Sequence, residues 1–455
     1  MANRNIWAVV VTAAALTVGS GGSAAALSAP GGPTDALSAP GGPTAAQIAK
    51  ALATPTTLTY WSWDLSAKAS VAAFEKLHPA IKINYVDEGV AGAEYQKIRT
   101  ALAANSGVPD VVFMEGEIVP SFAETHSLLD LSTMGAASLK DQFLPASWGA
   151  VALGHAVYGL PVGANVAANW YRKDLFAKAG IKSPPATWQQ FAADAKLLKA
   201  KTGAAIASVT PNDANMLLDA FFQSGAEPFN WTPGSTKVTI HLNSPQMEKV
   251  ANFWNALIQS GEASSVPAWG SAFYQAFNSG KLATWQAGIW GSPVLADNTK
   301  TSGEWRASTW PQWAPGAHNG AIWAGGITDQ VMKASKNPIA AYEFVKFRDA
   351  NVAFAKTKNV KYGWVPVLKA SLDAPWFLAT KEPFAGGQKV NAVFASVLHD
   401  TGAPWHYPPF MEFVNSSFTT TVGTAAANRT SLSAALDAWQ NAVVQYAKQQ
   451  GFTVN

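Results

Sequence analysis

The chain has 455 residues, of which 48% are hydrophobic and 13% are charged, and its formal net charge is +3. This length suits two domains of about 150 to 200 residues each, and the near balance of charge gives no indication of a nucleic-acid partner. The sequence contains no cysteine, which excludes disulfides, thiolate nucleophiles and cysteine-ligated metal clusters. Tryptophan is frequent, with 19 residues, and many of these lie in polar or glycine-rich stretches.

The first residues have the pattern of a secretory signal. Arg4 supplies a positive start, residues 6–18 form an apolar run, and residues 19–26 are rich in small side chains. The run is too short for a membrane span, so we expect residues 1–26 to be a signal peptide and the protein to function outside the cytoplasm. Gly21 stands where a lipoprotein signal would place a cysteine, so a lipid anchor is not predicted.

Low-complexity sequence follows this segment. Residues 26–34 read ALSAPGGPT, and residues 36–44 repeat the same letters. Proline and glycine at this density do not build a packed core. We therefore expect residues 27–55 to be a flexible linker and the fold to begin near Thr56.

Alternating strands and helices come next. Hydrophobic spacing predicts strands over 58–61, 81–86 and 109–114, with helices over 67–77 and 95–104 between them. Strand, helix, strand, helix, strand indicates a parallel sheet covered by helices. A strand ending at Tyr171 follows, then helices over 174–179, 188–201 with Thr187 as its cap, 245–260, 339–354 and 434–449. The order of elements predicts two α/β lobes.

Several short segments together resemble one known family. They are Tyr60-Trp61-Ser62-Trp63-Asp64, residues 74–83 (FEKLHPAIKI), residues 107–112 (GVPDVV), residues 158–161 (YGLP), residues 170–180 (WYRKDLFAKAG), residues 280–285 (GKLATW) and residues 323–326 (WAGG). In this order they resemble the family-1 extracellular solute-binding proteins, the sugar-binding components of bacterial ABC importers. The resemblance covers residues 56–370.

The resemblance implies a two-lobed periplasmic-binding-protein-like fold of type II, with the ligand in a cleft between lobes that are joined by a hinge. By analogy, lobe one comprises 56–164 plus 309–370, and lobe two comprises 165–308 plus 371–455. It implies a monomer that captures a carbohydrate, a di- or oligosaccharide, and delivers it to ABC transporter permease subunits by domain closure. No catalysis and no cofactor are implied.

The chemistry of sugars indicates which side chains to seek. Their C–H faces stack on aromatic rings, and their hydroxyl groups need carboxylate or amide partners. Such side chains lie on loops at the carboxyl ends of strands. The candidates that follow the first strands are Trp63, Asp64, Glu88 and Glu115, and Asn165 lies in the polar crossover. The resemblance adds Trp290, Gly291 and Ser292, the glycine loop with Trp323, Gly325 and Gly326, and the late loop with Tyr362 and Trp364.

Two alternatives stay open at this point. One is a secreted glycoside hydrolase, in which Glu88 and Glu115 would form the carboxylate pair, although no other catalytic motif is present. The other keeps the fold and changes the ligand to a glycerol phosphodiester, a polyamine or another polar solute. A polyamine would use the acidic candidates of the cleft, and a phosphate would need a basic side chain there.

Overall fold

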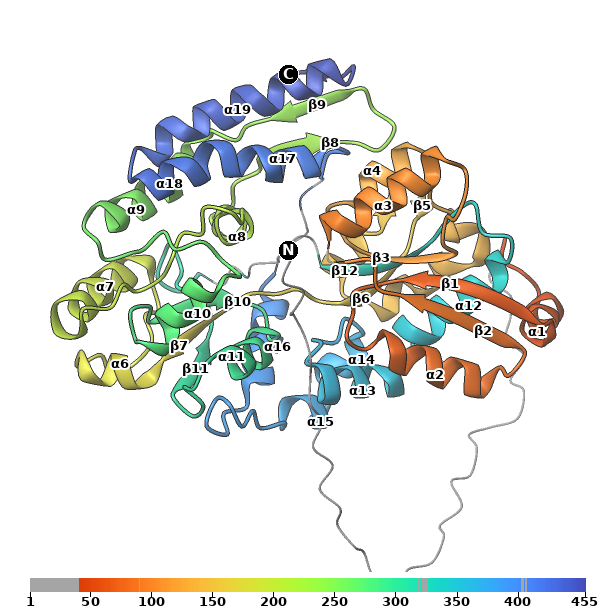
Figure 1. Ribbon diagram of the computed structural model, residues 1–455, viewed down its shortest axis with the longest axis horizontal. Helices are drawn as coiled ribbons and strands as arrows, with labels where there is room; N and C mark the ends of the chain where they lie inside the picture. The colour runs from red at the N-terminus through yellow and green to blue at the C-terminus, as the bar shows by residue number, and fades with distance from the viewer. Residues whose placement is uncertain (1–40, 90, 318–319, 321–325, 402–404, 406) are drawn as a thin grey trace, which may run out of the picture. The chain divides into compact units, whose positions relative to one another are not determined.

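The computed structural model describes residues 41–89, 91–317, 320, 326–401, 405 and 407–455. Within them the chain has an α/β fold with one five-stranded sheet, two three-stranded sheets and a short hairpin (Figure 1). The expected signal peptide, Trp323 and Gly325 lie outside the described residues. None of the described helices has both the length and the apolar character that crossing a membrane requires.

The five-stranded sheet has the order β2-β1-β3-β12-β6. Its strands are β1 (Thr56–Trp61), β2 (Ile81–Val86), β3 (Val111–Glu115), β6 (Leu160–Gly163) and β12 (Ile327–Val331). β1 runs parallel to β2 and β3, as predicted, whereas β12 is antiparallel to β3 and β6. Residues 111–114 of β3 are fully buried and the strand ends at the partly exposed Glu115, so it delivers a carboxyl group to the sheet edge.

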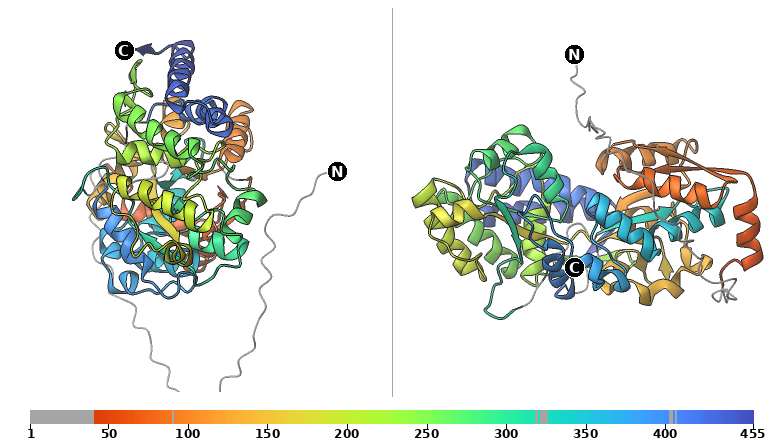
Figure 2. Two further views of the ribbon diagram at one scale, coloured as in Figure 1. Left: turned by 90° about the vertical axis from the view of Figure 1, so that its left-hand side faces the viewer. Right: turned by 90° about the horizontal axis from the view of Figure 1, so that it is seen from below.

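Helices from both halves of the chain surround this sheet. They are α1 (Ala45–Ala53), α2 (Ala67–Leu77), α3 (Gly92–Ala103), α4 (Val119–Glu124), α5 (Pro145–Gly149), α12 (Pro338–Asp349), α13 (Val352–Tyr362) and α14 (Lys369–Leu372), with 3-10 turns at Leu131–Met134 and Ala136–Gln142 and the hairpin β4 (Ala152–Leu153) and β5 (Ala156–Val157). α12 packs against α1, α2 and β12, so segments far apart in the sequence lie side by side (Figure 2).

A second group of elements is built around the sheets β10-β7-β11 and β13-β9-β8. Its strands are β7 (Ala168–Arg172), β8 (Phe229–Trp231), β9 (Lys237–Ile240), β10 (Thr284–Ala287), β11 (Trp305–Ser308) and β13 (Thr453–Val454). Its helices are α6 (Lys173–Lys178), α7 (Trp188–Thr202), α8 (Asn215–Gln223), α9 (Pro245–Gln259), α10 (Ser271–Asn278), α11 (Gly291–Asn298), α15 (Pro375–Leu378), α16 (Val390–His399), α17 (Met411–Phe418), α18 (Thr424–Asn428) and α19 (Leu432–Gln449), with a π-helical turn at Thr419–Gly423.

In a two-lobed fold these two groups of elements would form separate lobes, and the division of the chain at the predicted residues stays a prediction. β12, α12 and α13, from the range 309–370, join the first sheet, whereas α16 packs on β7 and β11 and α19 packs on α9 and β9. We call the first group lobe one and the second lobe two. The residue at which each crossing occurs stays a prediction.

The folded part includes residues before the expected start at Thr56. Helix α1 occupies Ala45–Ala53, inside the range 27–55 that was expected to be a flexible linker. Its start is a capping box: the Gln47 backbone N–H donates to Thr44 Oγ1 at 3.3 Å, and the Thr44 N–H donates to Gln47 Oε1 at 2.8 Å. Thr-x-x-Gln before an alanine-rich run is a helix-start signal that the repeat sequence obscured.

The expected single helix over 339–354 is wrong, because two helices occupy this stretch. α12 ends at Asp349, and Asn351 caps the start of α13 by accepting a hydrogen bond from the Phe354 N–H at 3.1 Å. The asparagine side chain accepts a hydrogen bond from a backbone N–H group that has no partner within the helix, and this stabilises the start of a new helix at this point. The predicted helices over 67–77 and 188–201 and the strand over 81–86 are confirmed to within one residue.

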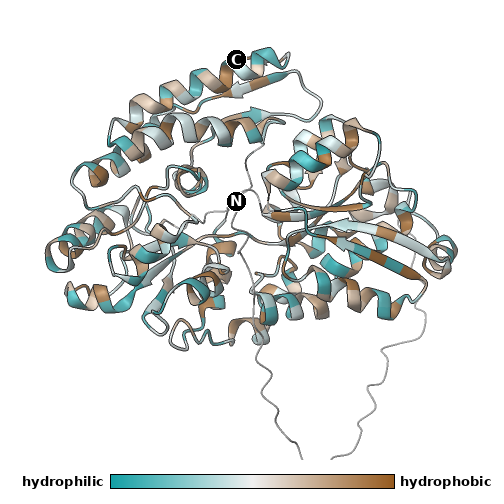
Figure 3. Ribbon diagram, in the orientation of Figure 1, coloured by the Kyte–Doolittle hydropathy of each residue, from teal (hydrophilic) through white to brown (hydrophobic). Residues whose placement is uncertain are grey.

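Packing follows the hydropathy of the sequence. Helices carry hydrophilic residues beside hydrophobic ones, as expected of elements with one exposed and one buried side (Figure 3). The buried apolar residues form two clusters, and one of them joins Leu58 and Tyr60 of β1 to Trp170 of β7 and Trp305 of β11. Much of the tryptophan is therefore core, since Trp170, Trp188, Trp254, Trp305 and Trp439 are almost completely buried.

Thr187→Ala is expected to lower the free energy of unfolding by about 1 kcal/mol. Thr187 Oγ1 accepts the hydrogen bond from the Gln190 N–H at 3.1 Å at the start of α7, and alanine would leave that donor without its partner. Urea unfolding measures the change. Thr187→Ser keeps the hydroxyl group and is the matched control, so equal losses in the two variants would contradict the capping role.

Candidate functional site

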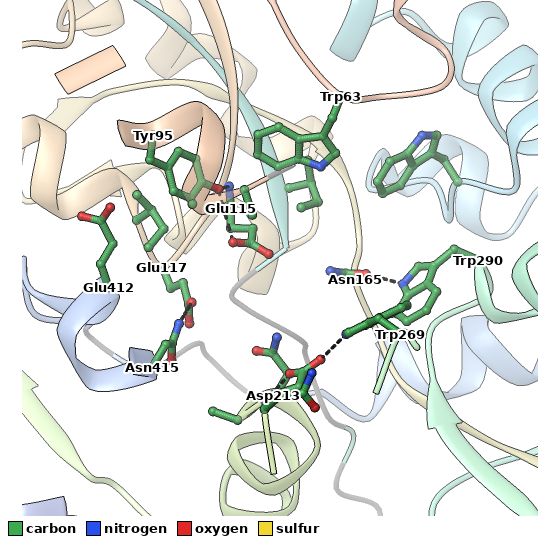
Figure 4. A pocket seen from close by; sticks show the side chains of 18 residues that line it. Trp63, Tyr95, Glu115, Glu117, Asn165, Asp213, Trp269, Trp290, Glu412 and Asn415 are labelled. Carbon is green, nitrogen blue, oxygen red and sulfur yellow. Dashed lines mark hydrogen bonds between the residues drawn. The ribbon is translucent and has the colours of Figure 1, made fainter. Parts of the chain in front are cut away.

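A cavity of about 510 Å³ opens where β1 and β3 end, between elements of the two lobes (Figure 4). Aromatic rings, carboxyl groups and side-chain amides supply most of its polar and flat surface. Its described lining residues are Trp63, Ala91, Gly92, Tyr95, Glu115, Glu117, Ile118, Asn165, Asn212, Asp213, Ala214, Asn215, Trp269, Trp290, Ile327, Trp364, Glu412 and Asn415.

Lobe one contributes two tryptophans. Trp63 follows β1, and its ring meets Phe113 edge to face at a centroid distance of 4.9 Å. Trp364 follows α13, and its indole N–H donates to Asp64 Oδ1 at 2.8 Å. A Cβ atom at Gly163 would lie 2.6 Å from the Trp364 ring, so glycine is required there for the ring to pack against β6. Both indoles are thus held in place by the first sheet.

Lobe two contributes Trp269 and Trp290, whose ring centroids lie 5.6 Å apart. The Trp290 indole N–H donates to Asn165 Oδ1 at 2.8 Å, and the Trp269 indole N–H donates to Asp213 Oδ2 at 2.8 Å. Trp269 is 45% exposed and has φ +70°, a conformation rare for a bulky residue. Such strain persists where the surroundings fix the backbone and is common in binding sites.

Asn212 fixes that backbone. Its Oδ1 accepts from the Ala268 N–H at 2.8 Å, and its Nδ2 donates to the Ala268 carbonyl at 3.2 Å. The residue before Trp269 is therefore held by a side-chain amide from another loop. This pair of hydrogen bonds presents the exposed indole to the cavity at a defined angle.

Four carboxyl groups line the cavity, Glu115, Glu117, Asp213 and Glu412, and the first three have no basic partner among the described residues. Glu115 Oε2 accepts from the Tyr95 hydroxyl at 3.2 Å, and Glu117 Oε1 accepts from Asn415 Nδ2 at 2.6 Å. Burial raises the pKa of Glu115 to about 7, and burial with the nearby Glu115 charge raises the pKa of Glu117 to about 8. Burial also raises the pKa of Asp213.

These shifts predict a loss of stability as pH rises. A carboxyl group whose pKa in the folded state exceeds its ordinary value near 4.5 favours the folded state below that value, and the contribution is lost as pH approaches the raised pKa. We expect the melting temperature to fall by several degrees between about pH 5 and about pH 8. The decline should shrink in the double variant Glu115→Gln/Glu117→Gln, and an unchanged decline would contradict the assignment.

Direct contacts join the lobes beside these acids. Arg99 of α3 forms an ion pair with Glu412 of α17, and Asn415 of the same helix donates to Glu117. On the neighbouring helix α4, Glu124 Oε1 accepts from the Gly234 N–H at 2.9 Å. The acidic end of the cavity is therefore one place where hydrogen bonds join lobe two to lobe one.

Five of the residues predicted from the sequence line this cavity: Trp63, Glu115, Asn165, Trp290 and Trp364. Asp64 does not line it. Its side chain is completely buried, and its carboxylate receives hydrogen bonds from Arg348, Ser66 and Trp364, so it holds a tryptophan in place. Whether the five lining residues bind ligand stays a prediction.

The remaining candidates lie near the cavity or away from it. Glu88 forms an ion pair with Lys97 and is not among the lining residues. Gly291 and Ser292 are buried at the start of α11, behind Trp290, and Tyr362 is half-buried at the end of α13. Gly326, with φ +85°, precedes the lining residue Ile327, and its carbonyl accepts from the Gly116 N–H at 2.9 Å.

Sequence reasoning missed Glu117, Asp213, Trp269 and the two α17 residues Glu412 and Asn415. The segment Glu115-Gly116-Glu117 at a strand end contained a signal for the second carboxyl group. Trp269 lies in a loop that contains proline and glycine. A tryptophan in such a loop is often exposed, and this was the available signal for a binding residue. α17 lies in the stretch beyond residue 370, where the resemblance is weak.

The residues described do not include a group of three histidine, aspartate or glutamate side chains arranged to share a metal ion. The groups that the cavity offers to a ligand are aromatic faces, amides and carboxyl groups. Flat rings on two sides with hydrogen-bonding groups between them suit a flat, polyhydroxylated ligand.

Comparison with known proteins points to one family. Residues 60–347 match the family model described as bacterial extracellular solute-binding protein. The lactose-binding protein of Rhizobium radiobacter is 26% identical over 374 residues, which cover 78% of this chain and 85% of that protein.

Two solved structures have a fold similar to that of this chain. The ABC transporter associated binding protein of B. animalis subsp. lactis Bl-04, in complex with β-1,6-galactobiose, has a TM-score of 0.77 at 28% identity and covers 88% of this chain and 99% of its own. The galacto-N-biose-/lacto-N-biose I-binding protein of Bifidobacterium longum, in complex with lacto-N-biose, also has a TM-score of 0.77, at 23% identity, and covers 88% of this chain and 98% of its own.

Proposed function

This chain belongs to the bacterial extracellular solute-binding proteins, and from that premise we propose that it captures a di- or oligosaccharide outside the cytoplasm for an ABC transporter. It is a binding protein and not an enzyme, as the family and its solved relatives are. The proposed ligand class follows relatives named for lactose and β-1,6-galactobiose. The proposed partners are the permease subunits of the transporter, and the proposed working form is a monomer.

The observation that carries the proposal is the pairing of tryptophans across the cavity. Trp63 and Trp364 come from lobe one, and Trp269 and Trp290 come from lobe two. Each lobe also supplies hydrogen-bonding groups, Glu115 and Glu117 on one side and Asp213 on the other. A sugar ring between them has aromatic faces for its C–H surfaces and acceptors for its hydroxyl groups.

We propose that binding is coupled to closure of the lobes. A ligand that contacts both lobes binds the closed arrangement more tightly than the open one and so shifts the population toward it. The contacts of Arg99 with Glu412 and of Glu117 with Asn415 already join the lobes at the acidic end. Both contacts are fully formed in this arrangement, so they hold the lobes together at that end.

The alternatives fare less well against the same residues. The carboxylate pair of a hydrolase was to consist of Glu88 and Glu115, but Glu88 is held by Lys97 outside the cavity. A glycerol phosphodiester would need a basic partner, and the lining residues that the structure describes include no lysine, arginine or histidine. Neither the hydrolase nor the phosphodiester is supported.

A thermal-shift screen tests the proposal. The protein without residues 1–26 is mixed with mono-, di- and oligosaccharides, and with glycerol phosphates and polyamines for contrast. A saccharide at a hundredfold excess over its dissociation constant adds about 2.7 kcal/mol to the free energy of unfolding, which raises the melting temperature. If no saccharide raised the melting temperature and a charged solute did, the proposed ligand class would be contradicted.

Small-angle scattering tests the closure. The radius of gyration should decrease when the best saccharide of the screen is added. Arg99→Ala removes one contact between the lobes and should leave the unliganded protein less compact than the unaltered chain. A ligand that binds tightly without any compaction would contradict closure while leaving the saccharide assignment in place.

A further inference from the structure

The charge of the cavity is one-sided. Its described lining residues include four acidic side chains, Glu115, Glu117, Asp213 and Glu412, and no basic one. The nearest cation in contact with this set is Arg99, which is paired with Glu412 and also donates to Ser121 at 3.0 Å. Among the described residues, therefore, one of the four carboxylates has a basic partner.

The other three receive hydrogen bonds from neutral donors alone. Tyr95 donates to Glu115, Asn415 donates to Glu117, and Trp269 and the Asn215 backbone N–H donate to Asp213. Neutral donors satisfy oxygen atoms without compensating negative charge. Buried carboxylates without compensation repel one another and are costly to ionise.

Glu117 adds an observation of a different kind. It is 2% exposed, yet it lines the cavity, and only its Oε1 receives a hydrogen bond, from Asn415, among the residues described. Its second oxygen receives no hydrogen bond from the described residues, so it can accept one from a ligand in the cavity. Figure 4 shows it together with Glu115 and Asp213 around the same open space.

We propose that the saccharide bound here carries a positively charged amino group, which lies between Glu115, Glu117 and Asp213. The inference rests on the proposed function, because it specifies which saccharide the same cavity takes. An ammonium group donates up to three charge-assisted hydrogen bonds and supplies the charge that neutral donors do not. The tryptophan faces on either side accept the rest of the sugar and also favour a cation.

The test uses isothermal titration calorimetry near neutral pH with matched saccharides. Disaccharides of galactose and glucose are compared in three forms: the neutral sugar, the same sugar with a free 2-amino group, and the N-acetylated amine. Acetylation keeps the nitrogen and removes its charge. The free amine is expected to bind at least about tenfold more tightly than both other forms.

The outcomes separate the two proposals. Saccharides that bind equally well with and without the free amine would overturn the amino-group inference and leave the proposed function intact. A panel in which no member binds would contradict the proposed function, and the amino-group inference would fall with it.

Variants locate the preference. Glu117→Gln and Asp213→Asn remove charge with little change of shape, and each should lower the ratio of amine affinity to neutral-sugar affinity several-fold. The ratio is insensitive to a general loss of affinity. Asp141→Asn, which alters an exposed carboxylate outside the cavity, is the control and should leave the ratio unchanged. A ratio that survives both cavity substitutions would overturn the inference.

Discussion

Trp290→Ala is expected to weaken saccharide binding about a hundredfold, which corresponds to about 2.7 kcal/mol. The Trp290 ring packs against Trp269 at 5.6 Å and against Trp285 at 5.4 Å, and its indole N–H reaches Asn165. Alanine would remove a stacking face, release the exposed Trp269 ring and leave the Asn165 oxygen without its donor. Calorimetric titration with the best saccharide of the screen measures the loss.

Two variants sharpen this test. Trp290→Phe keeps an aromatic face and loses only the indole N–H, so its affinity should lie between those of the alanine variant and the unaltered protein. Trp376→Ala makes the same alanine replacement at a half-buried tryptophan outside the cavity and should leave affinity unchanged. An alanine variant at position 290 that binds like the unaltered chain would refute the role of this ring.

Arg348→Met is expected to lower the free energy of unfolding by about 3 to 5 kcal/mol. Arg348 is completely buried and contacts three carboxylates: Asp64, Asp329 at 2.6 Å and Asp349 at 3.4 Å. Lys358 reaches Asp349 at 3.1 Å and is the other cation of this cluster. Removing the arginine would leave three buried acids with one cation, which is far more costly than the loss of a surface pair.

Urea unfolding measures this effect, and the same helix supplies the control. Lys346→Met breaks a pair with Glu343 in which the lysine side chain is 36% exposed, so its cost should stay below about 1 kcal/mol. The double variant Arg348→Met/Asp329→Asn removes one of the unpaired charges and should recover part of the loss. Equal costs for Arg348→Met and Lys346→Met would show that the buried cluster has no special weight.

The binding of saccharide should also weaken in the folded fraction of Arg348→Met. Arg348 holds Asp64, and Asp64 accepts the indole N–H of the cavity residue Trp364. Losing the arginine therefore frees a ring that lines the cavity. Asp64, which was predicted to bind ligand, therefore contacts the lining residue Trp364 and does not itself line the cavity.

Local signals predicted much of the fold. The apolar spacing of residues 67–77 and the alternation of residues 81–86 correspond to α2 and β2, because both patterns reflect a single buried face. Trp63 and Glu115 were identified because side chains just after parallel strands collect at one edge of the sheet. Trp290 and Trp364 required the family resemblance, since neither follows a strand of the first sheet.

Long-range pairing could not be predicted in the same way. Asp64 reads as a free loop acid in the sequence, and only the fold brings Arg348 to it across 284 positions. Trp269 depends on Asn212 and Asp213, and Glu117 depends on Asn415, which lies 298 positions away. No periodic pattern encodes such contacts, because they depend on how two lobes meet.

The position of β12 within its sheet bears on how the chain acquires its structure. β12 separates β3 from β6, so a growing chain that ends before Ile327 lacks the strand that joins the two sides of the first sheet. Tyr60 and Asp329, which share a hydrogen bond at 3.0 Å, are 269 positions apart. Contacts this distant form slowly, because the entropy cost of closing a long loop comes before the contact contributes any stability. The sheet of lobe one is therefore completed only after more than 300 residues have been synthesised, so a chain released before Ile327 cannot form it.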